Sequence, residues 1–333
     1  MEFIYFEGKI VPAEEAKISI KTNSFHYGTA IFEGIRAYYD KETDKMYGLF
    51  FKEHYERLFS NMKVLNMQIE ETIDDLVEIT KELVRKNNYK EDVYIRPIVY
   101  FSDLKISPKL IGFQSRIAVY TLPLGDYIDT DNGVKAITSS WTRLNDNMIP
   151  PRLKVAGAYV NSAFSKTEAI RAGADEAIVL NKNGYVSEGS AENIYIVRDK
   201  KLITPPVSDD ILEGITRWAV MVIAKDLGYE VIERSISRTE LYVADEVFFC
   251  GTGAQVSPVI NIDNIQIGDG KPGPITKEIQ KVYFDAVRGK LDKYKEWVIP
   301  IDWGEFSKLH WRKFKGKISK YRDKERNFLL IHF

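Results

Sequence analysis

The chain has 333 residues, 44% of them hydrophobic and 29% charged, which is the composition of a soluble globular protein long enough for two domains. Its 47 basic and 48 acidic side chains leave a net charge of -1, so no overall field favours nucleic acid or a membrane surface. The single cysteine, Cys250, excludes an internal disulfide framework and a cysteine-based metal cluster.

Targeting and metal-binding patterns are also missing from the sequence. No apolar segment follows a basic start, and no apolar run approaches the roughly 18 residues of a membrane span, so we expect a cytoplasmic protein without a membrane partner. The histidines have no pairwise spacing of metal ligands, so we expect no metal site. They are His26, His54, His310 and His332.

The first 122 residues are predicted to form a small domain of strands and helices. Residues 3–11 alternate in the manner of a β-hairpin with a glycine turn. Apolar residues recur at helical spacing over 53–65, and Thr72 is a good N-cap for a second helix that ends near Asn87. The glycines near residues 31–39 suggest close backbone approach rather than a regular element. Two more strands are predicted over 93–101 and 116–122.

A break in the pattern separates this part from a larger domain. Residues 123–130, with Pro123 and Gly125, are predicted to link domain 1–122 to domain 131–302. Strands and helices are mixed there without strict alternation, which favours an α+β fold over a doubly wound parallel sheet. Helices are predicted over 159–172, 214–227 and 275–288, and strands over 134–138, 176–180, 193–197, 202–204, 229–232 and 246–250.

The last segment, 303–333, forms a basic tail. It has nine Lys and Arg against three Asp and Glu, a net charge of +6, while the rest of the chain carries -7. One interpretation is a solvated or packed terminal appendage, which we prefer. The other is a patch for an anionic partner such as nucleic acid.

Two segments carry reactive side chains in an unusual context. Lys154 follows Pro150 and Pro151, which hold the backbone extended, and small residues come after it and keep its surroundings open. Glu188 stands beside Gly189 shortly after a turn. A lysine amine and a separate carboxylate are what pyridoxal phosphate requires, the first for a Schiff base and the second for the ring nitrogen.

Phosphate binding is suggested by two glycine-containing segments. Gly214 opens a predicted helix, whose first N–H groups and positive dipole end attract an anion, and Thr216 adds a hydroxyl. Residues 251–254 offer a second backbone cradle at a strand end, and Arg57 on the first helix could add a bidentate charge. These features alone also fit a non-catalytic protein that binds a phosphate ligand.

Together the segments resemble the branched-chain amino-acid aminotransferases, which are fold-type IV pyridoxal-phosphate enzymes of aminotransferase class IV. The resemblance covers roughly residues 3–300. It rests on Phe32-Glu33-Gly34-Ile35-Arg36, Glu53-His54-Tyr55-Glu56-Arg57-Leu58, Tyr94-Ile95-Arg96-Pro97, Lys154, Ser187-Glu188-Gly189, Glu192-Asn193, Gly214-Ile215-Thr216-Arg217 and Gly251-Thr252-Gly253-Ala254.

The resemblance implies a fold, a reaction and partners. The fold would be two α/β domains with the active site at their interface, in a homodimer or higher homo-oligomer. The reaction would move the amino group of L-leucine, L-isoleucine or L-valine to 2-oxoglutarate by a ping-pong mechanism in amino-acid biosynthesis. The expected partners are therefore small amino and 2-oxo acids, and the expected cofactor is pyridoxal 5'-phosphate.

The resemblance also implies roles for individual residues. Lys154 would be the catalytic lysine that forms the Schiff base, and Glu188 would pair with the ring nitrogen. The implied cofactor-binding residues are Arg57, Lys154, Tyr159, Glu188, Leu212, Gly214, Ile215, Thr216 and Thr252. The implied substrate-binding residues are Phe32, Tyr94, Arg96, Leu124, Gly253, Ala254 and, from the neighbouring subunit, Tyr27.

Two departures from the family's pattern leave the side-chain preference open. Leu124 stands where relatives often have tryptophan, and the loop 102–112 lacks the glycine-rich character of some relatives. Alternatives on the same fold are a D-amino-acid aminotransferase, an (R)-amine transaminase and an aminodeoxychorismate lyase.

Overall fold

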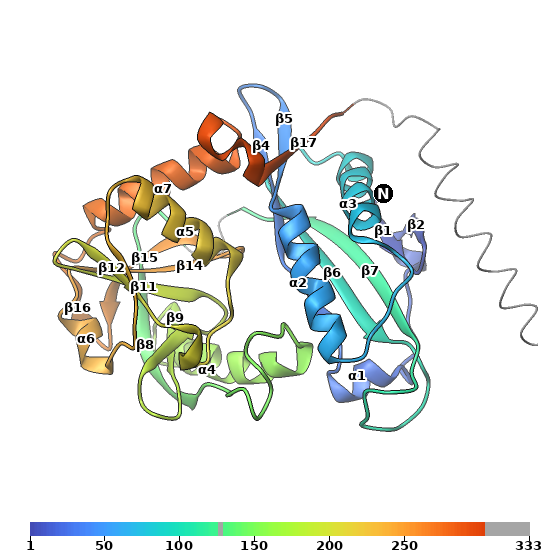
Figure 1. Cartoon of the computed structure of the whole chain (residues 1–333), viewed down its shortest axis with the longest axis horizontal. Coiled ribbons are helices and arrows are strands. Elements are labelled where there is room, and N and C mark those ends of the chain that lie inside the picture. Colours follow the sequence, from blue (N-terminus) through green and yellow to red (C-terminus); the bar gives the residue numbers. More distant parts are fainter. Residues whose placement is uncertain (126–128, 304–333) are drawn as a thin grey trace, which may run out of the picture.

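The computed structural model describes residues 1–125 and 129–303, which form two sheets, each with its own helices (Figure 1). Residues 126–128 of the predicted linker and residues 304–333, nearly all of the predicted basic tail, lie outside the described residues. The two sheets and their helices confirm the predicted α+β class. Among the described helices, none is long and apolar enough to cross a membrane.

The first sheet is antiparallel throughout its described pairs. Its strand order is β17-β5-β4-β6-β7-β1-β2, and β3 pairs with β6. The strands are β1 (Phe3–Phe6), β2 (Lys9–Pro12), β3 (Ile31–Phe32), β4 (Ile35–Asp40), β5 (Lys45–Leu49), β6 (Val93–Phe101), β7 (Ser115–Pro123) and β17 (Val298–Ile301). The edge strand β17 comes from the C-terminal end of the described chain, so these residues complete the sheet that the N-terminal part of the chain forms.

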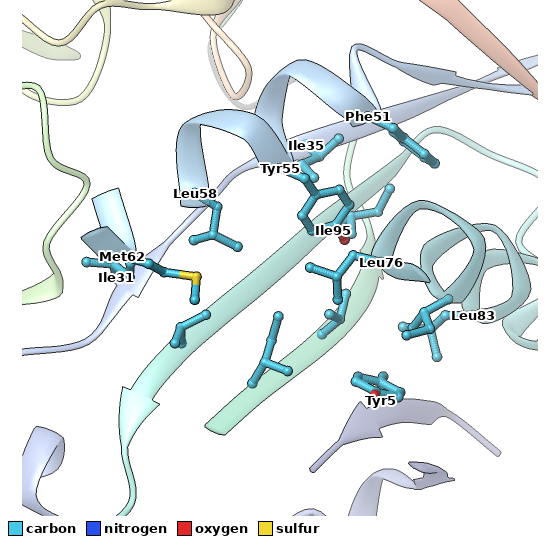
Figure 2. Close-up of a cluster of buried hydrophobic side chains, with 14 of the residues drawn as sticks. Tyr5, Ile31, Ile35, Phe51, Tyr55, Leu58, Met62, Leu76, Leu83 and Ile95 are labelled. Atoms are coloured by element: carbon cyan, nitrogen blue, oxygen red, sulfur yellow. The ribbon is translucent and has the colours of Figure 1, made fainter. Parts of the chain in front are cut away.

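Two helices, α2 (Phe51–Val64) and α3 (Ile73–Asn87), cover one face of this sheet. Thr72 caps α3 as predicted: its hydroxyl accepts a hydrogen bond from the N–H of Asp75, whose carboxylate accepts one from the N–H of Thr72. Figure 2 shows side chains of both helices, among them Leu58 and Leu76, pointing into one core over β6. The apolar residues that recur at helical spacing in the sequence thus form the helix faces that are buried against the sheet.

The second sheet mixes parallel and antiparallel pairs in the order β10-β9-β8-β15-β14-β11-β12-β13, with β16 paired to β15. Strand β8 is parallel to both β9 and β15, and β12 is parallel to β13. The strands are β8 (Val134–Thr142), β9 (Glu176–Leu180), β10 (Val186–Gly189), β11 (Asn193–Arg198), β12 (Lys201–Thr204), β13 (Val231–Glu233), β14 (Glu246–Gly251), β15 (Gln255–Ile262) and β16 (Ile265–Gln266).

Alternate residues of the central strands serve two separate cores. On β14, Phe248 and Cys250 pack with the helices α5 (Ile215–Asp226) and α7 (Pro274–Val287), whereas Val247 and Phe249 join the core on the other face. The continuous apolar run of β14 follows from burial on both faces. The remaining helices are α1 (Asn23–Tyr27), α4 (Tyr159–Arg171), α6 (Arg238–Tyr242) and the 3-10 turns η1 (Ala13–Glu15), η2 (Ala156–Ala158), η3 (Val207–Asp209) and η4 (Asp292–Trp297).

Backbone contacts between distant segments join the two sheets. The N–H of Ala156 donates to the carbonyl of Ala30, and the N–H of Phe32 donates to that of Lys154. Gly28, with φ of +62°, lies so close to Gly157 that a Cβ on Gly28 would stand 2.8 Å from the Gly157 Cα. This seam places the segment after the two prolines against β3, so Lys154 lies between the sheets.

Residues 31–39 differ from the sequence prediction. The expectation of an irregular segment is wrong, because β3 and β4 occupy most of it and hydrogen-bond to β6. The expectation of close backbone approach is met at Gly28, beside Gly157, whereas at Gly34 a Cβ would clash with the side-chain hydroxyl of Tyr94. Gly34 therefore serves contact with a neighbouring strand, which single-sequence periodicity does not reveal.

Candidate active site

A cavity of about 410 Å³ lies between the two sheets and collects most of the residues singled out by the sequence. Tyr27 and Thr216 are exceptions, since neither lines it. Thr216 is buried in the first turn of α5, and Tyr27 ends α1 elsewhere on the surface. The predicted residues that line the cavity are Phe32, Arg57, Tyr94, Arg96, Leu124, Lys154, Tyr159, Glu188, Leu212, Gly214, Ile215, Thr252, Gly253 and Ala254.

Lys154 reaches the cavity from the extended segment that pairs with β3. Its Nζ donates a hydrogen bond of 2.6 Å to the hydroxyl of Tyr159, the first residue of α4. The same Nζ lies 5.1 Å from the centre of the Phe32 ring, and the Phe32 and Tyr159 rings are 4.9 Å apart. The amine is therefore held at the boundary between an aromatic wall and the polar part of the cavity.

Glu188, on β10, is held by three different groups. Its Oε1 lies 2.5 Å from Nη2 of Arg143, and its Oε2 accepts hydrogen bonds from the Asn193 side chain at 2.9 Å and the Leu212 N–H at 3.0 Å. Burial raises the pKa of Glu188, and the charge of Arg143 opposes that shift. The sequence did not indicate Arg143, because it lies in a loop with no motif around it.

Arg57 is held by the carboxylate of Glu33, a residue of the motif 32–36 for which the sequence indicated no role. Glu33 is fully buried and accepts from Nε and Nη2 of Arg57 at 2.8 and 2.7 Å, and its Oε2 also lies 2.8 Å from Nδ1 of His54. Burial would raise the pKa of Glu33, but the charge and hydrogen bonds of Arg57 outweigh it and hold that pKa well below its usual range. The pair fixes the guanidinium in a bidentate geometry.

The fixed Arg57 meets the N-terminus of α5. Its Nη1 donates to the carbonyl of Glu213 at 2.8 Å, directly before the cap residue Gly214. A Cβ on Gly214 would clash with Oδ1 of Asn193, so a larger residue at the cap would displace the amide that donates to Glu188. A guanidinium beside a helix N-terminus, where the first N–H groups lack helical partners, forms an anion-binding site.

Another part of the cavity wall combines aromatic rings with the guanidinium of Arg96. Tyr94 and Arg96 project from the same face of β6, and Nη2 of Arg96 donates to the Tyr94 hydroxyl at 2.7 Å. The Arg96 guanidinium lies 4.2 Å from the centre of the Phe32 ring. Such a pocket can hold an apolar side chain against the rings or a carboxylate against the guanidinium.

Comparison of the sequence with known proteins finds one family model and a set of relatives that share one name. The family model described as "Amino-transferase class IV" matches residues 30–262. A probable branched-chain-amino-acid aminotransferase of Aquifex aeolicus is 60% identical over 302 residues, covering 90% of this chain and 97% of that protein. The branched-chain-amino-acid aminotransferase of Escherichia coli K12 is 38% identical over 306 residues, covering 90% of this chain and 98% of that protein.

Solved structures are similar over the same length. A branched-chain aminotransferase from the archaeon Thermoproteus uzoniensis, crystallised with norvaline, superposes with a TM-score of 0.87 at 43% identity, covering 90% of this chain and 99% of that one. The branched-chain amino acid aminotransferase of Thermobaculum terrenum, in its holo form with pyridoxal phosphate, gives a TM-score of 0.86 at 37% identity, covering 90% of this chain and 98% of that one.

Proposed function

This chain belongs to the class IV aminotransferases, and from that premise we propose how its cavity moves an amino group from L-leucine, L-isoleucine or L-valine to 2-oxoglutarate. It is a branched-chain-amino-acid aminotransferase of fold type IV, as relatives of that name at 60% and 38% identity over nine-tenths of the chain indicate. The same-fold alternatives and the non-catalytic binding protein are not favoured. The observation that supports the residue roles is one cavity lined by Lys154, Glu188 and Arg57.

The cavity fits pyridoxal 5'-phosphate in three respects. Lys154 supplies an amine, the buried Glu188 carboxylate already faces a cation in Arg143, and Arg57 with the N-terminus of α5 suits a phosphate. When bound, the cofactor supplies an electron-withdrawing ring that stabilises negative charge at the substrate α-carbon. We assign its binding to Arg57, Lys154, Tyr159, Glu188, Leu212, Gly214, Ile215, Thr216 and Thr252.

Proton transfer at the substrate α-carbon is the task that we assign to Lys154. General base catalysis requires an amine within reach of the reacting atom and fixed in orientation. The backbone of Lys154 is tied to β3 by the hydrogen bond from the Phe32 N–H, and its Nζ is tied to the Tyr159 hydroxyl. Glu188, whose charged form is favoured by the nearby Arg143, would in turn favour the protonated form of the ring nitrogen.

Recognition of two unlike substrates is assigned to the aromatic end of the cavity. A branched aliphatic side chain would lie against Phe32 and Leu124, and the second carboxylate of glutamate would bind Arg96 and Tyr94. The N–H groups of Gly253 and Ala254 would bind the α-carboxylate that all these substrates share. Apolar contact and charge-assisted hydrogen bonding then use different parts of one pocket.

We also propose a homodimer or higher homo-oligomer in the cytoplasm. Helix α1 is tied to the loop that follows β6, since the Asn23 side chain donates to the carbonyls of Lys105 and Ser107. This surface exposes large apolar side chains, among them Phe25 and Ile106, of the kind that subunit interfaces cover. A partner seated there would allow Tyr27, which does not line its own cavity, to enter the neighbouring one.

The function is tested with the purified protein and pyridoxal phosphate. Borohydride reduction followed by peptide mass analysis is expected to find the cofactor on Lys154. Half-reactions followed by absorbance are expected with L-leucine, L-isoleucine and L-valine, and not with D-alanine. Reaction with D-alanine and none with L-leucine would reject the branched-chain assignment, and a colourless protein without the adduct would reject the enzyme itself.

A further inference from the structure

Arg36 is a buried arginine outside the cavity whose side chain connects three separate parts of the chain. It lies on β4 and is 1% exposed. Its Nε donates to the carbonyl of Thr252 at 2.9 Å and its Nη2 to that of Gly253 at 3.3 Å. Its Nη1 and Nη2 donate to the carbonyls of Leu124 and Gly125 at 3.1 and 2.8 Å. One guanidinium therefore ties β4 to the predicted linker and to the turn between β14 and β15.

The partners of this cation are dipoles rather than charges. Within residues 1–125 and 129–303, the hydrogen bonds of the Arg36 side chain all end on backbone carbonyls, and no carboxylate there forms an ion pair with it. A buried cation attracts the negative ends of those carbonyls strongly, because little water screens it. Its effect is thus concentrated on the peptide groups that it touches.

Two of those peptide groups belong to the turn at the cavity. The carbonyl of Thr252 shares a peptide unit with the N–H of Gly253, and the carbonyl of Gly253 shares one with the N–H of Ala254. The peptide bonds are trans, so each N–H points opposite to its carbonyl and hence away from Arg36. The next carbonyl, that of Ala254, accepts a hydrogen bond from the Ser257 hydroxyl. Three successive carbonyls of the turn are therefore held by hydrogen bonds from Arg36 and Ser257.

We propose that Arg36 is a positioning residue for the substrate α-carboxylate. By holding the carbonyls of Thr252 and Gly253, it aims the N–H groups of Gly253 and Ala254 at the cavity, and by drawing electron density toward those carbonyls it strengthens the same N–H groups as donors. Its bond to Leu124 fixes the cavity wall relative to that turn. This inference rests on the proposed function, which assigns the two N–H groups to the substrate carboxylate.

The test measures carboxylate binding separately from cofactor binding. The variants are Arg36→Met, which removes the charge, and Arg36→Lys, which keeps the charge but lacks the forked geometry. The matched control is Arg288→Met, because Arg288 also approaches the Tyr38 ring, at 5.4 Å against 5.8 Å for Arg36, but pairs with Asp92 away from the turn. The probe is 4-methylvaleric acid, a carboxylate without an amino group, titrated into each protein loaded with pyridoxal phosphate.

Arg36→Met is expected to weaken binding of 4-methylvaleric acid by about tenfold or more, with a smaller loss in Arg36→Lys. The dissociation constant of pyridoxal phosphate should stay within about twofold, and Arg288→Met should match the unchanged protein in both measurements. With L-leucine, Arg36→Lys should raise KM more than it lowers kcat, since the interaction is made with the bound substrate.

Unchanged binding of 4-methylvaleric acid in both Arg36 variants would overturn the proposal. So would an equal loss of cofactor and carboxylate binding, or failure of both variants to fold, since Arg36 would then only support the structure. If Arg36→Met alone fails to fold, the lysine variant decides. If the unchanged protein binds neither pyridoxal phosphate nor 4-methylvaleric acid, the proposed function fails before the variants are compared.

Discussion

Arg143 and Glu188 form an ion pair inside the cavity, with Nη2 2.5 Å from Oε1 and both side chains largely buried. The other carboxylate oxygen is occupied by the Asn193 amide and the Leu212 N–H. The carboxylate is thus oriented before any ligand enters, and the cost of moving it is avoided when a cationic heterocycle binds. Glu188 acts from β10 and Arg143 from the segment after β8, so the pair also links two parts of the second sheet.

Removing the charge of Glu188 should slow the reaction more than it weakens cofactor binding. Glu188→Gln keeps the shape of the side chain but no longer offers a full negative charge to the ring. We expect the rate of the half-reaction with L-leucine to fall by roughly 10²- to 10³-fold. Single-turnover absorbance measurements provide the rate. The control is Glu213→Gln, a half-exposed glutamate paired with Arg152, which should stay within about threefold, and an equal effect in both variants would contradict the assignment.

Lys154 should be required for the covalent adduct and for proton transfer. In Lys154→Ala, borohydride reduction should leave no cofactor attached to the chain, and turnover should fall by roughly 10²- to 10⁴-fold or more. Exposed Lys182 is a suitable control, and Lys182→Ala should behave as the unchanged protein. A trapped adduct on another lysine in Lys154→Ala would refute the role of Lys154.

Loss of Arg96 should separate the two substrate classes. Arg96→Ala removes the cation beside Phe32, so we expect kcat/KM for 2-oxoglutarate to fall by about 100-fold and that for L-leucine by less than about tenfold. Steady-state kinetics with each substrate varied in turn gives both values. Arg116→Ala on the neighbouring strand β7, where the arginine contacts Gln114, should change neither. Equal losses for both substrates would show that Arg96 does not discriminate between them.

The ion pair between Glu33 and Arg57 should make the stability of the protein decrease at low pH. The folded-state pKa of Glu33 is depressed, so its contribution is complete above the unfolded value of about 4.3 and is lost as the pH falls below that value. Glu33→Gln should therefore destabilise the protein by about 3–5 kcal/mol at pH 7, and by less at pH 3. Urea unfolding at both pH values measures the difference.

The surface pair of Glu78 with Lys81 is the control for Glu33, and Glu78→Gln should cost less than about 1 kcal/mol at either pH. Since Glu33 also fixes Arg57, the Glu33→Gln protein should bind pyridoxal phosphate more weakly while its affinity for pyridoxal, which lacks the phosphate, stays the same. A loss of affinity for both compounds would contradict the link to the phosphate.

The contribution of Glu192 to stability should depend on pH in the opposite direction to that of Glu33. Burial, followed by the nearby carboxylate of Glu176, raises the pKa of Glu192 above its usual range. Above the unfolded pKa of about 4.3 the folded state then holds the extra proton, so the free energy of unfolding decreases as the pH rises toward the raised folded value. Glu192→Gln should flatten this decrease between pH 5 and 8, by up to about 1.4 kcal/mol per pH unit. Unfolding curves at several pH values, with exposed Glu42→Gln as control, test the sign.

Much of the fold could be predicted from local patterns. Helix α3 with its Thr72 cap, the two strands β6 and β7, and helix α4 after Lys154 appear within a residue or two of the expected limits. Each depends on periodicity, capping or breakers within a few residues, and these are readable in sequence. Strand β15 was not predicted, because it follows a turn directly and contains Pro258.

By itself the sequence determined which reactive groups the chain carries: a lysine after two prolines, a carboxylate beside a glycine, and a helix opened by glycine. Only the tertiary structure decided how those groups are held. Arg143 reaches Glu188 across 45 residues, and Arg36 reaches the turn at Thr252 across 216. Such contacts depend on which strands become neighbours in the folded chain, and a pattern confined to a few adjacent residues contains no record of that choice.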